Sequence, residues 1–357
     1  MNPLIISQRC QGFVTVTILA SLFSCVEPID FHPQSDVISS LTVSGKLVYS
    51  NPSIVTVAVG RVLDYNPTPT EGVDMRAAYL FDDQGNEVQI PEVGIGKYAL
   101  TIPPGAPDIE IMTGHSYGIR LESNTGKQYI STPQEILPVP ATEQLTYEPS
   151  TRRVLDASGF FFNVPYINFY LNTKILNPTS GEPAFLHWQI ELTSKFNDAK
   201  THVCYRTQSI NDNQIRILNG YEYTTDEASI PIYESSLYSS YAHGSYLHVI
   251  QEPIPAEAYE YWKSVRTVLA RSGNMFEIPA GKVRSNIHNT DDPEEDVFGF
   301  FYATETDTIR VYVDPARFDP ISPYCTSSGQ NGSCISYCCD CSGDPASTIT
   351  KPYYWKE

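Results

Sequence analysis

The chain has 357 residues, of which 41% are hydrophobic and 18% are charged, so it is long enough for two domains and apolar enough to bury a core in each. This composition excludes an intrinsically disordered chain. A formal net charge of −18 repels nucleic acids and anionic lipid headgroups, so it disfavours binding to DNA or RNA and peripheral binding to membranes.

The first 24 residues have the pattern of a signal peptide. Arg9 precedes an apolar run of about a dozen residues, which is too short to remain in a membrane as a spanning helix. The run continues into Leu22-Phe23-Ser24-Cys25, which fits a lipobox, where the cysteine sulfur receives a diacylglycerol. We therefore expect removal of residues 1–24 and lipidation of Cys25, since several acyl chains on one residue give durable anchoring. The alternative is an ordinary secretory signal with an incidental cysteine.

Residues 25–37 are expected to form a lipid-anchored tether, because two prolines in it disfavour regular structure. The next segment, 38–140, contains short runs of alternating apolar residues, such as 41–47 and 54–59, separated by turn residues. About seven such strands over about 100 residues predict an immunoglobulin-like or fibronectin-like β-sandwich. Leu137-Pro138-Val139-Pro140 closes this domain as a stiff linker.

The second domain, 141–357, is predicted to be a β-rich sandwich or barrel with one packed helix. Residues 160–176 and 185–192 have the pattern of long strands. A helix is expected over 255–271, where Ala258, Trp262, Val265 and Leu269 recur at helical spacing on one face. We expect this helix to pack across a sheet or to cover the end of a barrel. The predicted fold class is therefore mostly β.

Six cysteines remain once Cys10 leaves with the signal peptide and Cys25 carries the lipid. An even number in an exported chain favours disulfides, and we expect them to tie the C-terminal tail onto the second domain, with the pairing left open. Zinc is the alternative, but adjacent cysteines do not comfortably ligate one tetrahedral ion, so no metal is expected. The six candidates are Cys204, Cys325, Cys334, Cys338, Cys339 and Cys341.

The sequence contains no recognisable catalytic or cofactor motif, so we expect no catalytic residue and no cofactor, and the ligand-binding residues stay unassigned. Five carboxylates between Asp291 and Asp296 lack the glycine and the spacing of a calcium loop, and they indicate a solvated turn. His243 and His248 would point to opposite faces of a strand. A tyrosine cluster could stack on sugars or form an interface, or it could fill half-buried strands, and it comprises Tyr221, Tyr223, Tyr233, Tyr238, Tyr241 and Tyr246.

Several short motifs follow the lipobox in a fixed order along the chain. They are Gly96-Lys97-Tyr98-Ala99-Leu100, His115-Ser116-Tyr117-Gly118-Ile119-Arg120-Leu121, Gly126-Lys127-Gln128-Tyr129-Ile130-Ser131, the 137–140 linker, Tyr261-Trp262, Gly273-Asn274-Met275-Phe276, Val297-Phe298-Gly299-Phe300-Phe301, Cys338-Cys339-Asp340-Cys341 and Lys351-Pro352-Tyr353-Tyr354-Trp355. Together they resemble outer-membrane lipoproteins of unknown function from Bacteroidota, typically encoded beside TonB-dependent, SusC-type receptors. The pair Cys325 and Cys334 goes beyond the cysteines expected for that group.

This resemblance implies a non-enzymatic lipoprotein, anchored to the outer membrane by its N-terminal lipid on the cell-surface or periplasmic face. Its expected partner is a TonB-dependent nutrient transporter, for which it would bind either the nutrient or the barrel. Two other functions stay open at this point. One is a surface hydrolase acting on a glycan or a peptide, and the other is a structural or adhesive envelope protein.

Overall fold

The structure is a computed structural model that describes residues 40–61, 72–212, 214–271, 283, 285–323, 325 and 336–356. The predicted signal peptide, Cys25, the tether and Cys334 lie outside these residues. Within them the chain is mostly β-strand, which confirms the predicted fold class. No helix in this part of the chain is both long enough and apolar enough to cross a bilayer.

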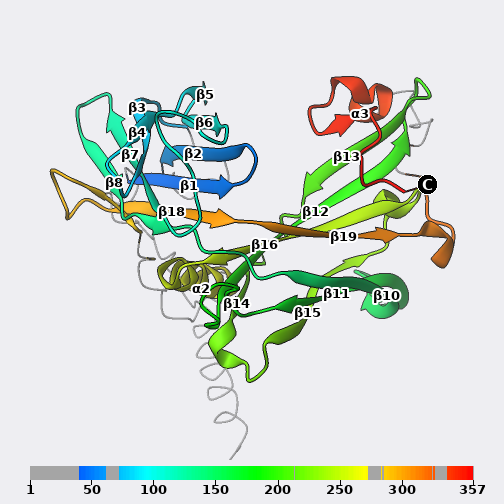
Figure 1. The fold of residues 1–357 in the computed structure, drawn as a ribbon. Coiled ribbons are helices and arrows are strands. Elements are labelled where there is room, and N and C mark those ends of the chain that lie inside the picture. The colour runs from blue at the N-terminus through cyan, green and yellow to red at the C-terminus, as the bar shows by residue number, and fades with distance from the viewer. Residues whose placement is uncertain are drawn as a thin grey trace, which may run out of the picture.

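The first body is a sandwich of two sheets, drawn in blue, cyan and orange in Figure 1. One sheet has the strand order β18-β1-β2-β6-β5, and the other has the order β17-β8-β7-β3-β4, with β9 paired to β7. The strands of the first sheet are β1 (Leu41–Tyr49), β2 (Ser53–Arg61), β5 (Glu92–Gly94), β6 (Lys97–Ile102) and β18 (Val297–Glu305). Those of the second are β3 (Met75–Asp82), β4 (Glu87–Gln89), β7 (Ser116–Ser123), β8 (Gln128–Ser131), β9 (Gln134–Glu135) and β17 (Ile287–Asn289).

The sandwich forms because apolar residues alternate along its strands. In β2, the buried residues Val55, Val57 and Val59 alternate with exposed ones, so one face of the strand enters the core. Val43, Leu80 and other apolar side chains from both sheets meet there. This alternation is the signal from which the sandwich was predicted.

Two strands of the first body come from the second half of the sequence. β18 pairs in parallel with β1 from Leu41↔Val297 to Tyr49↔Glu305, and β17 pairs with β8. Gly299 allows the close approach of β18 to β1. Its φ is +98°, and a Cβ atom there would lie 1.8 Å from the Val43 carbonyl oxygen. The sandwich therefore needs residues 287–305 to complete both of its sheets.

The second body also consists of two open sheets. Of the two predicted alternatives, a sandwich and a barrel, the described residues therefore form the sandwich-like one. The strand orders are β10-β11-β15 and β19-β16-β12-β13-β20, with β14 paired to β12. Their facing sides enclose a core that includes Phe169, Trp188 and Val249. The strands are β10 (Thr142–Leu155), β11 (Phe161–Lys174), β12 (Phe185–Asn197), β13 (Val203–Ser209), β14 (Arg216–Asn219), β15 (Glu227–Ser236), β16 (Ser245–Ile254), β19 (Asp307–Val313) and β20 (Ser347–Thr348).

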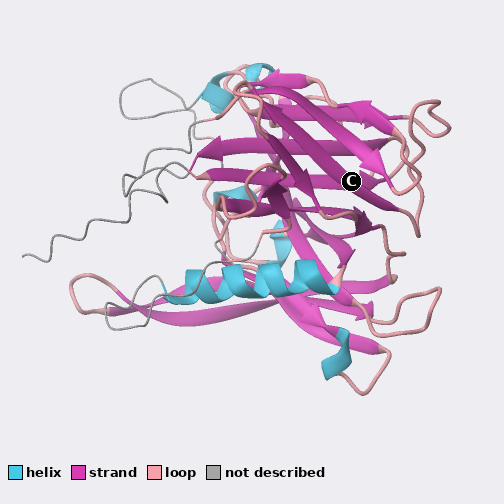
Figure 2. Ribbon diagram, turned by 90° about the vertical axis from the view of Figure 1, so that its left-hand side faces the viewer, coloured by secondary structure: helices cyan, strands magenta, loops and turns pink. Residues whose placement is uncertain are grey.

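The predicted helix is α2 (Ala256–Arg271), which Figure 2 shows in full length. It lies against β12, β14 and β18, with Ala258 fully buried and Tyr259 nearly so. It therefore packs across sheets. The other helices of the described residues are short, namely η1 (Gly220–Glu222), η2 (Ser239–Tyr241), η3 (Pro315–Arg317), α3 (Ser336–Cys339) and η4 (Cys341–Gly343).

The chain crosses between the two bodies three times, and two of these crossings are bonded to each other. β18 runs almost directly into β19, as the orange ribbon of Figure 1 shows. The 137–140 linker runs beside this junction, where the Val139 N–H donates to Glu305 Oε2 at 2.8 Å. The N–H and Oγ1 of Thr142 both donate to Asp307 Oδ2, at 2.8 and 2.7 Å. The two bodies are thus joined by bonded strands and not by a free hinge.

Candidate functional site

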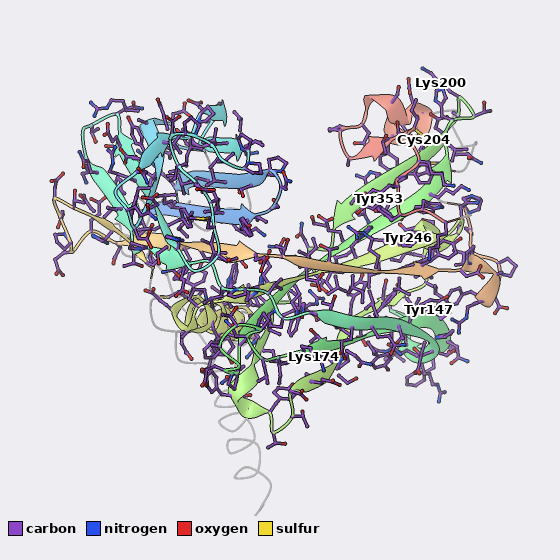
Figure 3. All side chains as sticks on the ribbon, viewed as in Figure 1. Tyr147, Lys174, Lys200, Cys204, Tyr246 and Tyr353 are labelled. Carbon is purple, nitrogen blue, oxygen red and sulfur yellow. A yellow bond between two sulfur atoms is a disulfide. The ribbon has the colours of Figure 1, made fainter. Side chains whose placement is uncertain are left out.

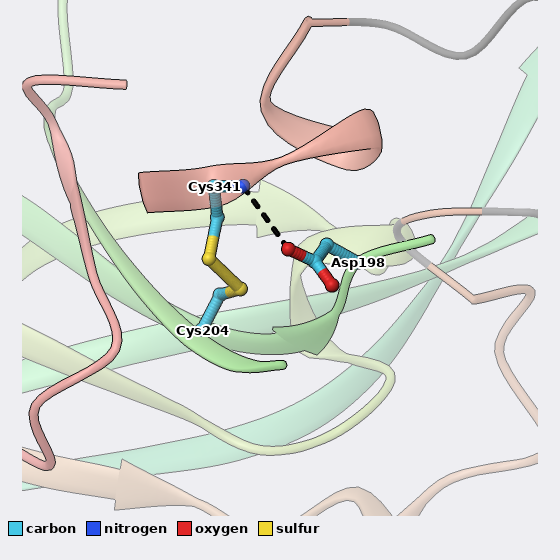
Figure 4. Close-up of side chains that lie close together, drawn as sticks. All are labelled: Asp198, Cys204 and Cys341. Carbon is cyan, nitrogen blue, oxygen red and sulfur yellow. Dashed lines mark hydrogen bonds between the residues drawn. A yellow bond between two sulfur atoms is a disulfide. The ribbon is translucent and has the colours of Figure 1, made fainter. Parts of the chain in front are cut away.

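The C-terminal tail is tied to the second body by a disulfide. Cys204, fully buried in β13, is bonded to Cys341 in η4 (Figure 4). Cys325 is bonded to Cys338 within the tail. Cys339 is disulfide-bonded as well. The structure therefore confirms that the chain contains disulfides and supplies two pairings that the sequence left open.

An Asp–His–Asp cluster beside this disulfide has the residue types of a metal site. Ligand atoms of Asp198, His202 and Asp340 lie within 4.8 Å of one another. However, the Lys200 ammonium contacts Asp340 at 2.5 Å, and Asp198 accepts hydrogen bonds from His202 and from the Cys341 N–H. Burial alone would raise the pKa of Asp198, but the His202 bonds outweigh it and lower that pKa. The carboxylates of this cluster are therefore already engaged by hydrogen bonds and by the Lys200 ammonium.

A second polar cluster lies where the two bodies meet. We call Lys46 of β1, Tyr302 of β18, His187 of β12 and Glu252 of β16 the junction cluster. The fully buried Glu252 carboxylate lies 2.5 Å from Lys46 Nζ. It also lies 3.0 Å from His187 Nδ1 and accepts the Tyr302 hydroxyl at 3.0 Å. Two partners come from the first body and one from the second, so the carboxylate is bonded from both sides.

The electrostatics of the junction cluster keep Glu252 ionised. Burial would raise its pKa, but the His187 hydrogen bond and the Lys46 charge outweigh burial and lower the pKa to about 2. Burial and the adjacent carboxylate raise the pKa of Tyr302, so its hydroxyl stays protonated. The Trp262 ring of α2 stacks on His187 with ring centroids 5.1 Å apart and covers that side. This arrangement favours a structural role for the cluster, because each of its polar groups is matched by another.

A third polar network lies on the same sheet near the C-terminus. His248 Nδ1 accepts from Arg310 Nε at 2.9 Å, so the neutral ring carries its proton on Nε2, which donates to Thr193 Oγ1 at 2.8 Å. Burial, and then the Arg310 charge, lower the pKa of His248 to about 4. The Tyr354 ring meets the His248 ring edge-on, and the Arg310 guanidinium lies over the Tyr354 ring. Figure 3 shows Tyr246 and Tyr353 on this side of the molecule.

A pocket of about 700 Å³ lies beside the middle of the β10–β11 hairpin, and we call it the hairpin pocket. Its lining includes one guanidinium, from Arg317, and one carboxylate, from Asp319, but no histidine or cysteine among the described residues. Such a mixed lining suits binding more than two-carboxylate chemistry. The lining residues are Pro149, Ser150, Thr151, Pro165, Leu237, Tyr238, Ser239, Ala316, Arg317, Phe318, Asp319, Pro320, Ile321 and Ser322.

The same hairpin ends in an exposed apolar group, which we call the aromatic tip (Leu155, Phe160, Phe161 and Phe162). Their exposed fractions are 55%, 73%, 58% and 49%. β15 pairs with β11 only over Tyr166–Lys174, so the hairpin beyond this range projects as a two-stranded ribbon. The sequence analysis missed the tip, although three consecutive phenylalanines directly after the turn residues 156–159 were a usable signal.

The other residues singled out from the sequence are dispersed. The acidic run forms the turn between β17 and β18, where Glu295 accepts from Lys127, Tyr129 and Asn289. His243 is in an exposed turn and does not lie near His248 in one site. The tyrosine cluster divides into buried rings (Tyr241 and Tyr246), half-buried rings (Tyr233 and Tyr238) and exposed rings (Tyr221 and Tyr223).

The fold and these sites define a multi-sheet β protein with two joined bodies and a disulfide-tied tail. The chain belongs to the family described as Domain of unknown function (DUF4249), whose model matches residues 26–310. This match covers the sandwich, the linker, α2 and the crossing from β18 into β19. No curated protein matches the chain.

Proposed function

We propose that this chain is a lipoprotein of the outer membrane that serves a TonB-dependent nutrient transporter as a non-enzymatic accessory. The observation that carries the proposal is the N-terminal sequence, in which an apolar run predicted to be a signal peptide ends at Cys25 with the pattern of a lipobox, shortly before the first strand. The family match begins at residue 26, directly after that cysteine. The motif order that resembles SusC-associated lipoproteins supports the choice of partner.

The internal chemistry supports binding over catalysis. Among the buried carboxyl and imidazole groups of the described residues, four lie in the clusters above and each is engaged by neighbouring side chains, namely Glu252, His187, Asp198 and His248. The hairpin pocket is the candidate site for a nutrient or for a segment of the transporter. It combines Tyr238 and Phe318, which offer ring surfaces, with Arg317 and Asp319, which offer one charge of each sign.

The test is purification of the lipidated protein from its native host in mild detergent, followed by mass spectrometry of what accompanies it. We expect a TonB-dependent barrel in stoichiometric amount and a diacylglycerol on Cys25. The matched control is Cys25→Ser, which should lose the lipid and leave the membrane fraction. A lipidated protein that repeatedly purifies without any barrel would contradict the transporter role and favour a free-standing binder or an envelope protein.

A further inference from the structure

The aromatic tip is apolar on both faces of the ribbon. Across the ribbon Leu155 pairs with Phe161, and Val154 pairs with Phe162. Because successive side chains of a strand point to opposite faces, these two pairs lie on opposite faces of the ribbon. Phe160, the most exposed of the rings, lies in the turn between the strands. A groove on a partner protein would cover one face of the ribbon, whereas the fluid apolar layer of a membrane surrounds both faces and the turn.

We propose that the aromatic tip inserts into the interfacial layer of a phospholipid membrane and orients the protein on it. The interaction surface is the end of the β10–β11 hairpin, and its partner is lipid. This inference goes beyond the proposed function, because it needs no transporter and no acyl chain on Cys25. Aromatic side chains are the residues that proteins place at membrane–water interfaces.

The polar groups of the tip are compatible with this insertion. The Asp156 carboxylate is engaged within the turn, where it accepts the N–H groups of Ser158 at 2.9 Å and Phe160 at 2.8 Å. The Asp156 N–H donates to the Phe160 carbonyl at 2.9 Å, which closes the ribbon. The turn therefore presents its carboxylate to its own backbone, and this reduces the cost of bringing the charge close to lipid.

Two cations lie directly behind the apolar residues. Arg152 is ion-paired with Glu234 of the neighbouring strand β15. Arg153 lies over the Phe161 ring at 4.4 Å, and no carboxylate among the described residues pairs with it. An exposed guanidinium at this level matches the phosphates of lipid headgroups, and it provides local charge complementarity on a chain that is acidic overall. Attachment therefore depends on the tip and not on the general surface.

The length of the ribbon fits a shallow insertion. Arg153 pairs with Asn163, and about three residues separate this level from Phe160, which corresponds to roughly 10 Å at the rise of a strand. Interfacial segments bury their apolar side chains about 5 to 10 Å deep. The outward backbone groups of a two-stranded ribbon would lack partners in the hydrocarbon core, so deeper insertion is disfavoured.

The test is flotation of the chain from residue 26 onward, which lacks the lipid but contains every described residue, with phosphatidylcholine vesicles. We expect the chain to float with the vesicles. The triple variant Phe160→Ser, Phe161→Ser, Phe162→Ser should lose at least about tenfold in partitioning, because each ring contributes apolar area to the bound state. The matched control is Val93→Ser with Ile95→Ser, which removes side chains 65% and 69% exposed on the sandwich. This control should float as the parent does.

A second measurement locates the tip in the bilayer. The Phe161→Trp variant should show added tryptophan fluorescence that brominated lipids quench, whereas the parent's signal should not change. Failure of the parent chain to float, equal losses in the tip and control variants, or an unquenched tryptophan would each overturn the proposal. These vesicles contain no transporter, so failure here is distinguishable from failure to find a barrel in the native host.

Discussion

The junction cluster and the aromatic tip both depart from the usual distribution of polar and apolar residues. The first places charged groups inside the protein, and the second places apolar rings on its surface. The junction cluster holds a buried carboxylate, a buried imidazole and a partly buried ammonium where the two bodies meet. The aromatic tip exposes three phenylalanine rings at the end of a ribbon. Inside the junction each polar group has a partner, and Glu252 has partners from both bodies, whereas among the described residues little covers the rings at the tip.

We therefore assign the junction cluster to the stability of the fold and the aromatic tip to binding of an external partner. A buried charge whose partners are supplied by the fold contributes to the specificity of how the two bodies meet, and its removal should affect stability. An exposed apolar group without cover contributes nothing to folding, so its presence calls for an external partner. Stability measurements test the role of the junction cluster, and vesicle binding tests the role of the aromatic tip.

The largest effect should follow from Lys46→Met. The substitution leaves the fully buried Glu252 carboxylate without its cationic partner, so we expect the free energy of unfolding to fall by about 3 kcal/mol. Urea denaturation in an oxidising buffer measures this loss. Adding Glu252→Gln should cost less than the sum of the two single variants, because the pair is coupled. Additive losses would contradict the junction cluster as a bonded unit.

A comparable loss should follow from lowering the pH. The fold holds His248 neutral with a pKa of about 4 instead of 6.5, so the unfolded chain binds more protons between these values. The contribution of neutral His248 to the free energy of unfolding is complete above pH 6.5 and is lost as the pH falls towards 4. The loss amounts to about 3 kcal/mol. Glu252, with its pKa lowered from 4.5 to about 2, adds a further loss below pH 4.5.

The control for the His248 part is His248→Gln, which keeps a neutral polar side chain but cannot be protonated. Its unfolding free energy should vary clearly less with pH between 6.5 and 4 than that of the parent. A variant with the parent's full pH dependence in this range would assign the effect to other groups.

A smaller loss should follow from Asp307→Asn at the crossing of the two bodies. The carboxylate accepts two hydrogen bonds from Thr142, and removing its charge weakens both, so we expect a loss of about 1.5 kcal/mol. Thermal unfolding monitored by circular dichroism measures it. Asp291→Asn on the exposed β17–β18 turn removes an identical charge and should change stability by less than about 0.5 kcal/mol. Equal effects would show that the crossing contributes no specific stability.

The smallest effect on stability should come from the aromatic tip. The triple serine variant of Phe160, Phe161 and Phe162 should unfold within about 0.5 kcal/mol of the parent, because these rings are exposed in the folded protein. Its loss of vesicle binding would then be a loss of function in a folded protein. A destabilisation above about 2 kcal/mol would show that the rings pack and would remove the contrast with the junction cluster.

The local elements of this fold could be predicted from short stretches of sequence. The alternation in Ser53–Arg61 predicts a half-buried strand, and that strand is β2. Pro255 and the helical spacing that begins at Ala258 predict a helix, and that helix is α2. The cysteine count predicted disulfides, because an even set in an exported chain favours them. Each of these signals extends over one element, so no knowledge of its neighbours is needed.

The pairing of distant segments could not be predicted in this way. Residues 297–305 were recognised only as a motif, and nothing within Val297-Phe298-Gly299-Phe300-Phe301 specifies a parallel partner more than 200 residues earlier in the chain. The junction cluster has the same origin, since Lys46 and Glu252 are 206 residues apart and neither has an unusual local context. Their contact exists only once β18 has joined the first sheet.

The sequence by itself therefore determined the strand-rich class, the position of the helix and the use of cysteines in disulfides, because these depend on local periodicity and composition. It also carries the predictions of the leader and of Cys25, which lie outside the described residues. Tertiary structure alone decided which sheets the late strands complete, which buried charges meet and which apolar residues remain uncovered. Burial and charge pairing are properties of contacts between distant segments, so they appear only when the sheets have assembled.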